Sequence, residues 1–289
     1  MRTIDLESLK IFRTVVDEGG VVRAANKLNR VQSNVTKRIR QLEEHLDARL
    51  FRREGRSIRL SAEGQTLLTY ADRLLRLADE TVSEMRTGKP KGVFRLGSLE
   101  STAGTRLPPI LSRYHSVYPD VVVELATGTT GALVTRVVNF ELEAAFVSEP
   151  FTAPGLQARP VFEEQLVLVT PKAIGKVSGP ADLGRSTLVA FAQGCSYRKR
   201  IEEWLSIANM MPERIMEFAS YQAMIACVAA GTGFAVVPKS VLDSLRAAKS
   251  IRQHALPKRF AVNRTYIVWH GDPSPSLRGL LSFFGGGAA

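Results

Sequence analysis

Polar and basic residues between positions 23 and 56 have side chains that could bind a nucleic acid. Amide and hydroxyl groups, which can hydrogen-bond to base edges, are concentrated at positions 32–36. Lysines and arginines, which bind phosphates, occur among them and on both sides. The predicted DNA-binding residues are Arg23, Gln32, Ser33, Asn34, Thr36, Lys37, Arg40, Arg52, Arg53 and Arg56.

An apolar repeat predicts that most of these residues lie on one helix. Val35, Ile39, Leu42 and Leu46 are spaced by four, three and four residues, so they share one face of an α-helix. We expect that face to be buried. The polar and basic side chains then lie on the opposite face, where they can meet DNA.

The neighbouring segments predict the elements that hold this helix. An amphipathic helix is expected from about residue 6 to 18, and a second helix carries the small pair Ala24 and Ala25, which lets two helices approach closely. After Phe51 a basic segment with Gly55 at its turn fits a β-hairpin. Three short helices and a hairpin that lies over phosphates are enough for a DNA-reading module.

The charge distribution supports this interpretation. Between Arg23 and Arg59 there are eleven lysines and arginines and four acidic residues, and the whole chain has a formal charge of +11 with a pI near 9.9. A basic helix is often only a solvated surface. Here the cations coincide with one helix face and a hairpin, which favours a polyanionic partner.

The run RAANKLNRVQSNVTKRIRQLEEHLDARLFRREGRSIRLSAEG resembles the winged helix-turn-helix of LysR-type transcriptional regulators. That family shows an Ala-Ala pair, a polar start to the recognition helix, Leu-Glu-Glu, Leu-Phe and a basic wing. Two departures concern the helix cap and the base preference. Val31 stands where the family commonly has Ser or Thr, and Ser33 and Asn34 replace a common Pro-Ala or Ser-Ala.

A long helix is predicted for residues 62–86. Leu67, Ala71, Leu74 and Ala78 begin an apolar seam along it, and Gly and Pro residues at 88–92 end it. The seam could pack on its own domain, but a helix of this length favours pairing between two chains. The resemblance likewise implies a linker helix for dimerisation and further assembly into a tetramer.

Beyond residue 92 strands and helices alternate. We predict strands at 93–98, 121–126 and 144–148 with helices at 102–117 and 132–140, and a second set with strands at 165–170, 187–191, 215–218 and 234–237 and helices at 197–208 and 222–230. A last strand at 262–270 and helix at 277–284 follow. These βαβ patterns predict parallel sheets in two α/β lobes that bind a ligand at their carboxyl strand ends. The resemblance implies an effector domain like periplasmic binding proteins, whose final strand and helix return to the first lobe.

Residues at the predicted strand ends are the candidate effector contacts: Ser98, Glu100, Ser101, Thr102, Thr127, Thr129, Ser148, Gln193 and Ser196. Thr130, Glu149 and Cys195 occupy the same strand ends. Hydroxyls and helix N-termini suit a small carboxylate, but Glu100 in the cleft would favour an amine or an amino acid. These residues could also be ordinary helix caps, and Cys195 could be a redox sensor or a small packing residue.

Several other classes are disfavoured. The two cysteines and four histidines lack metal-ligand spacing, and the sequence has neither a nucleophile elbow nor a phosphate-binding loop, so we expect no enzyme, cofactor or metal. The charged N-terminus does not resemble a signal peptide, which together with few cysteines favours the cytoplasm. A solute-binding protein and a ligand-free architectural DNA binder remain as alternatives.

We therefore expect a ligand-responsive transcription factor with three parts. They are a winged helix-turn-helix at 1–61, a linker helix at 62–91, and a two-lobed effector domain at 92–289, with lobe I at about 92–161 and 262–289 and lobe II at about 162–261. The expected partners are double-stranded DNA, a small-molecule effector and a second copy of the chain, with RNA polymerase as a further candidate and no membrane.

Overall fold

The structure is a computed structural model that describes residues 4–54, 57–87, 90–246 and 249–284. The chain divides into two compact units, Met1–Lys89 (unit 1) and Pro90–Ala289 (unit 2), and each is considered by itself. The predicted turn at Gly55 and the predicted DNA contact Arg56 lie outside the described residues, as does the side chain of Arg53.

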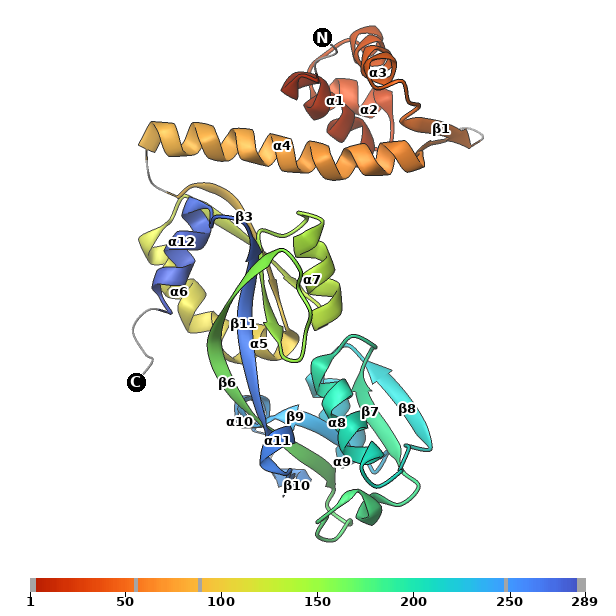
Figure 1. Ribbon diagram of the computed structural model, residues 1–289, viewed down its shortest axis with the longest axis vertical. Helices are drawn as coiled ribbons and strands as arrows, with labels where there is room; N and C mark the ends of the chain where they lie inside the picture. The colour runs from red at the N-terminus through yellow and green to blue at the C-terminus, as the bar shows by residue number, and fades with distance from the viewer. Residues whose placement is uncertain (1–3, 55–56, 88–89, 247–248, 285–289) are drawn as a thin grey trace. The chain divides into compact units, whose positions relative to one another are not determined.

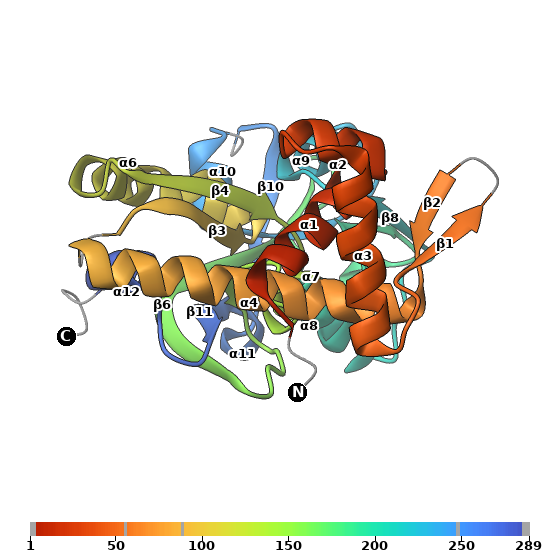
Figure 2. The same cartoon turned by 90° about the horizontal axis from the view of Figure 1, so that it is seen from above.

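Unit 1 begins with a bundle of short helices. Its described elements are α1 (Leu6–Asp17), α2 (Val21–Lys27) and α3 (Gln32–Leu46), followed by the hairpin strands β1 (Phe51–Glu54) and β2 (Ser57–Leu60) and by α4 (Ala62–Thr87). The hairpin extends beside α3 (Figure 2). Leu9, Phe12, Val35 and Leu42 pack in a common core. The predicted winged helix-turn-helix fold is confirmed.

A buried carboxylate fixes the path from α3 into the hairpin. Glu43 accepts a hydrogen bond from the Leu50 backbone N–H at 2.8 Å and pairs with Arg49 at 3.1 Å. The next helix approaches the same turn closely, because a Cβ added at Gly64 would lie 2.1 Å from the Leu50 carbonyl oxygen. Glycine is therefore required at position 64, where α4 meets the turn that leads into the hairpin.

The long helix α4 has two different halves. In its first half Leu67 and Ala71 are buried in the core of unit 1. Farther along, Leu77 and Val82 are 56% and 50% exposed. Packing on its own domain accounts for the first half of the seam, whereas the second half leaves apolar side chains in contact with solvent.

Lobe I of unit 2 is built around parallel strands β3 (Gly92–Ser98), β4 (Val121–Thr127) and β5 (Ala144–Ser148), with helices α5 (Glu100–Thr105), α6 (Leu107–Val117) and α7 (Thr130–Val138). The single helix predicted at 102–117 is wrong. The chain bends at Arg106, because Pro108 and Pro109 lack the N–H groups that would continue α5. Helix α12 (Pro275–Ser282) completes this lobe and packs with Tyr114.

Two long strands connect the lobes (Figure 1). They are β6 (Leu156–Pro171) and β11 (Val262–His270), which pair antiparallel with a register shift beside Pro160. In the described part of unit 2 the main sheet has the order β10-β6-β11-β5-β3-β4, and β9 also pairs with β6. The parallel pairing predicted for strands 93–98, 121–126 and 144–148 is confirmed by β3, β4 and β5. The parallel sheet predicted for the second set is wrong in part, since β9 is antiparallel to β6. The sequence also missed the first half of β6, LQARPVFE, which mixes apolar and polar residues, includes Pro160 and is only partly buried.

Lobe II contains β7 (Thr187–Phe191), β8 (Arg214–Phe218), β9 (Ala235–Pro238) and β10 (Ile251–Ala255), with the 3-10 helix η1 (Pro180–Leu183) and helices α8 (Ser196–Ser206), α9 (Tyr221–Ala229), α10 (Lys239–Ser244) and α11 (Lys258–Ala261). Only β7 and β8 form a parallel pair among its described strands, and β9 and β10 run antiparallel to β6. Strand β10 was not predicted, because its sequence IRQHA is mostly polar.

Among the described helices none is long and apolar enough to cross a membrane. The same residues contain no group of three or more His, Cys, Asp or Glu side chains that could hold a metal ion.

Candidate DNA-binding surface and inter-lobe site

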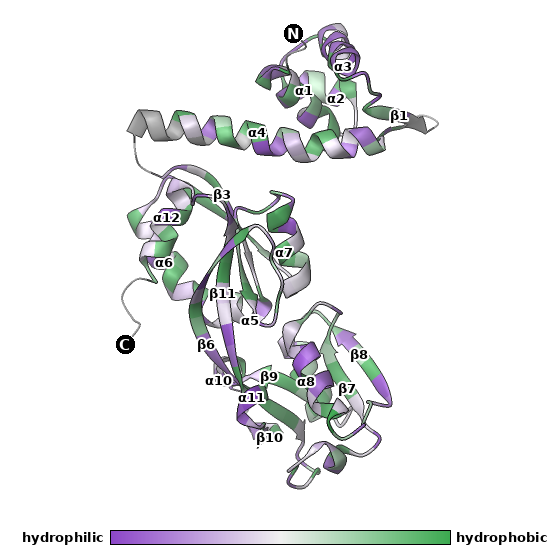
Figure 3. Cartoon of the chain, in the orientation of Figure 1, coloured by the Kyte–Doolittle hydropathy of each residue, from purple (hydrophilic) through white to green (hydrophobic). Residues whose placement is uncertain are grey.

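Helix α3 has one buried face and one polar face. Val35, Ile39 and Leu42 are buried, as predicted. On the other side a shallow groove is lined by Gln32, Ser33, Thr36, Lys37, Arg40, Gln41 and Glu44. Figure 3 shows α3 coloured largely as hydrophilic. The structure thus brings together five of the predicted DNA-binding residues, and the sixth on this helix, Asn34, is exposed at its N-terminal end.

The cations of unit 1 fall into two groups. Arg30 and Arg38 both pair with Glu7 of α1, and Arg38 also lies 3.7 Å from Asp5. Within the described residues Lys37 and Arg40 have no ion pair, so their charges are available for phosphates or base edges. Arg30 and Arg38 thus stabilise unit 1 through ion pairs, whereas Lys37 and Arg40 are available to a ligand.

The predicted contact Arg23 belongs to α2, and its side chain reaches back to the end of α1. Its Nε donates to the carbonyl oxygen of Glu18, and the Glu18 carboxylate pairs with Lys27 at 2.5 Å. The Glu18 carboxylate raises the pKa of Lys27 through their hydrogen bond. Arg23 is nevertheless exposed, so its guanidinium can still meet a phosphate beside the start of α2.

The hairpin places two arginines directly opposite each other. Arg52 pairs with Arg59 across β1 and β2, and both side chains are exposed. Exposed arginines on both strands give the hairpin side chains that can bind phosphates.

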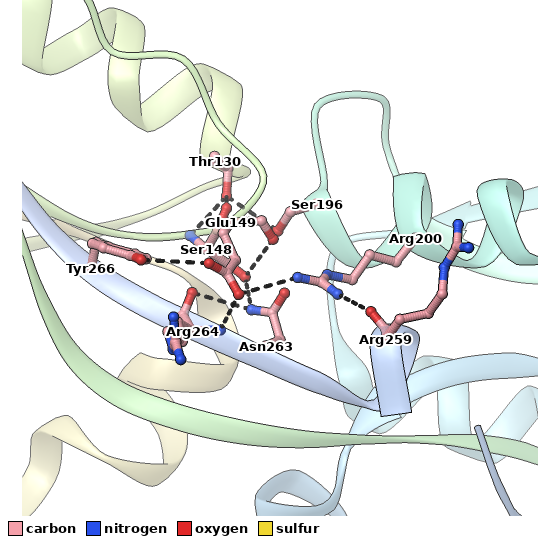
Figure 4. Close-up of polar contacts among 9 residues, drawn as sticks. All are labelled: Thr130, Ser148, Glu149, Ser196, Arg200, Arg259, Asn263, Arg264 and Tyr266. Atoms are coloured by element: carbon pink, nitrogen blue, oxygen red, sulfur yellow. Dashed lines mark hydrogen bonds and ion pairs between the residues drawn. The ribbon is translucent and has the colours of Figure 1, made fainter. Parts of the chain in front are cut away.

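Hydroxyl groups from both lobes of unit 2 meet where β5 ends (Figure 4). Thr130 Oγ1 accepts from the Ser148 backbone N–H at 3.2 Å and lies 3.4 Å from Ser196 Oγ. The Gly131 N–H donates to the Gly194 carbonyl at 3.2 Å. Asn263 of β11 donates its Nδ2–H to Ser148 Oγ. Predicted residues Ser148 and Ser196 are therefore linked through Thr130.

An ion pair joins the lobes beside these hydroxyls. Glu149 Oε1 accepts from Arg200 Nη2 at 3.3 Å and from the Arg264 backbone N–H at 3.2 Å, while Arg200 Nη1 donates to the Arg259 carbonyl at 3.0 Å (Figure 4). Sequence reasoning missed Arg200 and Asn263, because they come from the interior of α8 and from the last strand rather than from strand ends.

A second bridge lies on the connecting strand β6. Glu164, which is 3% exposed, accepts from Arg106 Nε and from Ser240 Oγ, both at 2.7 Å. Arg106 belongs to lobe I and Ser240 to lobe II. The hydrogen bond to Glu164 raises the pKa of Arg106. One carboxylate thus holds side chains from both lobes.

The remaining predicted effector contacts differ in burial. Ser98, Ser101 and Thr102 are buried, whereas Thr127 is exposed. Glu100 is half-buried, and burial raises its pKa although the backbone N–H of Tyr221 in lobe II opposes the shift. Tyr197 of α8 is buried and missed by the sequence analysis, and neither its hydroxyl nor that of Ser101 has a hydrogen-bond partner within the described structure.

A cavity of about 490 Å³ is shared by the two lobes. Its walls include Thr130, Gly131, Val134, Phe151, Gln193, Ser196 and Lys199. The N-termini of α7 and α8 both reach it, and Thr129 caps α7 by accepting from the Ala132 N–H at 3.4 Å. Cys195 also lines it, and burial raises the pKa of that thiol, which disfavours the reactive thiolate.

A winged helix-turn-helix joined to a two-lobed α/β domain defines a class of DNA-binding regulators. Residues 6–65 match the family model of the bacterial regulatory helix-turn-helix protein of the lysR family, and residues 87–288 match the LysR substrate binding domain. The chain belongs to the LysR family of transcriptional regulators, which are not enzymes.

Named relatives and solved structures agree with this assignment. The chain is 35% identical to the HTH-type transcriptional regulator GltR of Bacillus subtilis (strain 168), over 96% of this chain and 95% of GltR. It is 36% identical to the regulator CzcR of Bacillus anthracis, with 96% of each chain covered. A full-length OxyR variant from Pseudomonas aeruginosa has the same fold with a TM-score of 0.75, at 20% identity and 98% coverage of both chains. CbnR in complex with its target DNA gives 0.70, at 23% identity, covering 97% of this chain and 99% of CbnR.

Proposed function

We propose that this regulator reads a specific DNA site with α3 and that a small anionic effector binds between the lobes of unit 2. The observation that carries the effector proposal is the cavity shared by the lobes, at which the N-termini of two helices meet. Acting on chromosomal DNA, such a protein would work in the cytoplasm.

The DNA part of the proposal assigns roles along α3 and the hairpin. Gln32, Ser33 and Asn34 would contact base edges at the N-terminal end of α3, with Lys37 and Arg40 on the same exposed side. Arg52 and the other hairpin arginines would bind the flanking backbone. Phosphate contacts position the protein, and base contacts supply the sequence preference.

Pairing of two chains through α4 would place two such helices on DNA. Leu74, Leu77 and Val82 are exposed from the middle of that helix onward, and a partner helix would remove them from water. The tetramer is an expectation from the family resemblance, and RNA polymerase is a further candidate partner.

The lining of the cavity favours an anion with an apolar body. Helix N-termini attract negative charge, and Lys199 supplies a cation that has no ion pair among the described side chains. Val134 and Phe151 provide apolar walls. Glu202 also lines the cavity and pairs at 2.8 Å with Arg198, which pairs with Glu217 as well.

The amine alternative depends on Glu100. That carboxylate is not among the residues that line the cavity, and it is directed toward the first amide of α9. Glu100 therefore does not oppose an anion in this cavity. A small carboxylate is the effector class that the described side chains support best.

An effector can act here only by binding one lobe arrangement more tightly than another. The contacts at stake are the Thr130–Ser196 and Glu149–Arg200 pairs and the Glu164 bridge. A ligand in the cavity touches the first of these directly. We propose that its occupancy changes the lobe arrangement and, through it, the DNA-bound form of the dimer.

The test is a thermal-shift screen of the full chain against carboxylates, amino acids and polyamines. A ligand at 100 times its Kd adds about 2.7 kcal/mol to the free energy of unfolding. The expected result is stabilisation by a carboxylate that is lost in Lys199→Ala but kept in the control Lys172→Ala, an exposed lysine outside the cavity. Stabilisation by amines alone would reject the anion, and a folded chain without any response would favour the ligand-free architectural DNA binder.

A further inference from the structure

Val31 is an apolar residue at the most polar end of unit 1. It is the N-cap of α3, it immediately precedes Gln32, and it is 63% exposed. Its neighbours Gln32, Ser33 and Asn34 are exposed polar residues. An exposed, branched hydrocarbon side chain therefore immediately precedes, along the chain, the residues proposed to read bases.

Helix stability does not explain a valine here. The backbone of Val31 is extended, with φ −75° and ψ 142°, and its carbonyl accepts the first helical bond from the Asn34 N–H at 3.0 Å. Its side chain makes no capping hydrogen bond. A Ser or Thr at this position would accept a bond from a first-turn N–H and stabilise the helix.

Packing does not explain it either. The buried core of unit 1 includes Val35, one turn farther along α3, whereas Val31 is not part of that cluster. The remaining partner is the surface that α3 approaches. In the major groove the thymine C5-methyl is the apolar group that a base edge presents.

We propose that Val31 contacts a thymine methyl group and so contributes to the sequence preference of this regulator. This inference rests on the proposed reading of DNA by α3. The expected size of the effect follows from burial: transfer of one methyl-sized apolar group from water into such a contact changes the DNA-binding constant by about fourfold. Valine at this position makes the thymine contact but cannot cap α3. The protein thereby loses some helix stability and gains DNA sequence preference.

The experiment selects binding sites in vitro with the full chain and then replaces each thymine by deoxyuridine, which lacks only the methyl group. The wild type is expected to lose about fourfold in affinity at one thymine of each half-site. Val31→Ser should be indifferent to that replacement. Val31→Thr, which keeps one γ-methyl group, should retain sensitivity.

A second exposed valine supplies the control. Val22 of α2 is 56% exposed and belongs to the same helix-turn-helix, so Val22→Ser should keep the full response to deoxyuridine. Melting temperatures of all three variants show that they fold, and Val31→Ser should melt slightly higher because it gains a cap.

Two kinds of failure can be told apart. If Gln32→Ala and Arg40→Ala bind every sequence as the wild type does, α3 does not read DNA and the proposed function fails. If those variants lose affinity while no thymine responds to deoxyuridine, the inference about Val31 is wrong. A changed oligomeric state in Val31→Ser, without a change in thymine response, would instead make Val31 a contact between protein chains.

Discussion

On α3 Lys37 and Arg40 are exposed without an ion pair in the described part of unit 1, whereas between the lobes of unit 2 Arg200 and Glu149 bind each other. The charged groups of the first surface are open to solvent and are not neutralised by neighbouring described side chains. In the second, charged side chains pair with one another, and Glu164 holds Arg106 and Ser240 at 2.7 Å, while the buried hydroxyls of Ser101 and Tyr197 have no hydrogen-bond partner within the described structure. A surface that binds a polyanion must keep its charges available, while a site that responds to a ligand needs internal contacts that the ligand can alter.

The largest effect should come from breaking the buried bridge. Glu164→Ala removes the buried carboxylate that Arg106 and Ser240 share, and the loss of two hydrogen bonds to a charged group should cost about 2–3 kcal/mol, since Arg106 itself is 39% exposed. The chain's two tryptophans, Trp204 and Trp269, both lie in unit 2, so fluorescence during urea unfolding reports on that unit.

The control for this loss is Glu124→Ala. Glu124 pairs with Arg95 at 3.2 Å, but both side chains are about half exposed, so the expected loss is at most about 1 kcal/mol. Equal losses in the two variants would mean that the buried Glu164 contacts stabilise the fold no more than an exposed surface ion pair does.

The next effect concerns base reading. Arg40→Ala should weaken binding to a selected DNA site by about 1–3 kcal/mol, measured by fluorescence anisotropy, because its guanidinium is available to DNA. Arg38→Ala is the matched control on the same helix, since Arg38 pairs with Glu7 at 3.4 Å. A larger loss for Arg38→Ala would overturn the division of the cations into available and structural groups.

A smaller change is expected in the salt dependence of binding. Lys37→Ala should make the slope of log K against log salt shallower by about 1. Each phosphate contact releases counterions when the protein binds, and the variant makes one contact fewer. Lys27→Ala, whose ammonium pairs with Glu18 at 2.5 Å, should leave the slope nearly unchanged. Identical slopes for wild type and Lys37→Ala would remove Lys37 from the phosphate contacts.

The smallest effect should be a pH dependence of unit 2. Burial raises the pKa of Glu100 above its ordinary value of 4.5, so the folded state favours the protonated form. Stability from this group is therefore full below about pH 4.5 and decreases as the pH rises through the raised pKa. Glu100→Gln should remove that decrease and be slightly more stable than wild type at neutral pH.

Chemical unfolding between pH 4 and 7 measures this difference. Glu203→Gln, a substitution at an exposed carboxylate of α8, is the control and should follow the wild-type curve. A Glu100→Gln variant that loses stability at neutral pH would show that the carboxylate stabilises the inter-lobe contact despite its burial.

Much of unit 1 could be predicted because its signals are local. The spacing of Val35, Ile39 and Leu42 defines both faces of α3 within three turns of chain, and the hairpin follows directly. In unit 2 the same reasoning found most strands and the parallel pairing of β3, β4 and β5, but not the antiparallel pairing of β6 with β9 and β11. It also missed the first half of β6, since strand pairing with β11 across about a hundred residues is invisible to local patterns.

The effector-contact predictions show the same limit. Position after a strand identified Ser148 and Ser196, which the fold brings within reach of Thr130. It also selected Thr127, which is exposed at the end of β4. Arg200, Asn263 and Tyr197 could not be found in this way, because nothing in their local sequence marks them as neighbours of those hydroxyls.

The sequence by itself therefore determined the family, the helical reading surface and the existence of two α/β lobes, because periodicity, turn residues and a forty-residue motif act over short distances. Only the tertiary structure decided which charges are neutralised and which polar groups meet across the lobes. Ion pairs such as Arg38–Glu7 and Glu149–Arg200 join residues that are far apart in the chain. Their formation depends on packing that brings separate elements within a few ångströms.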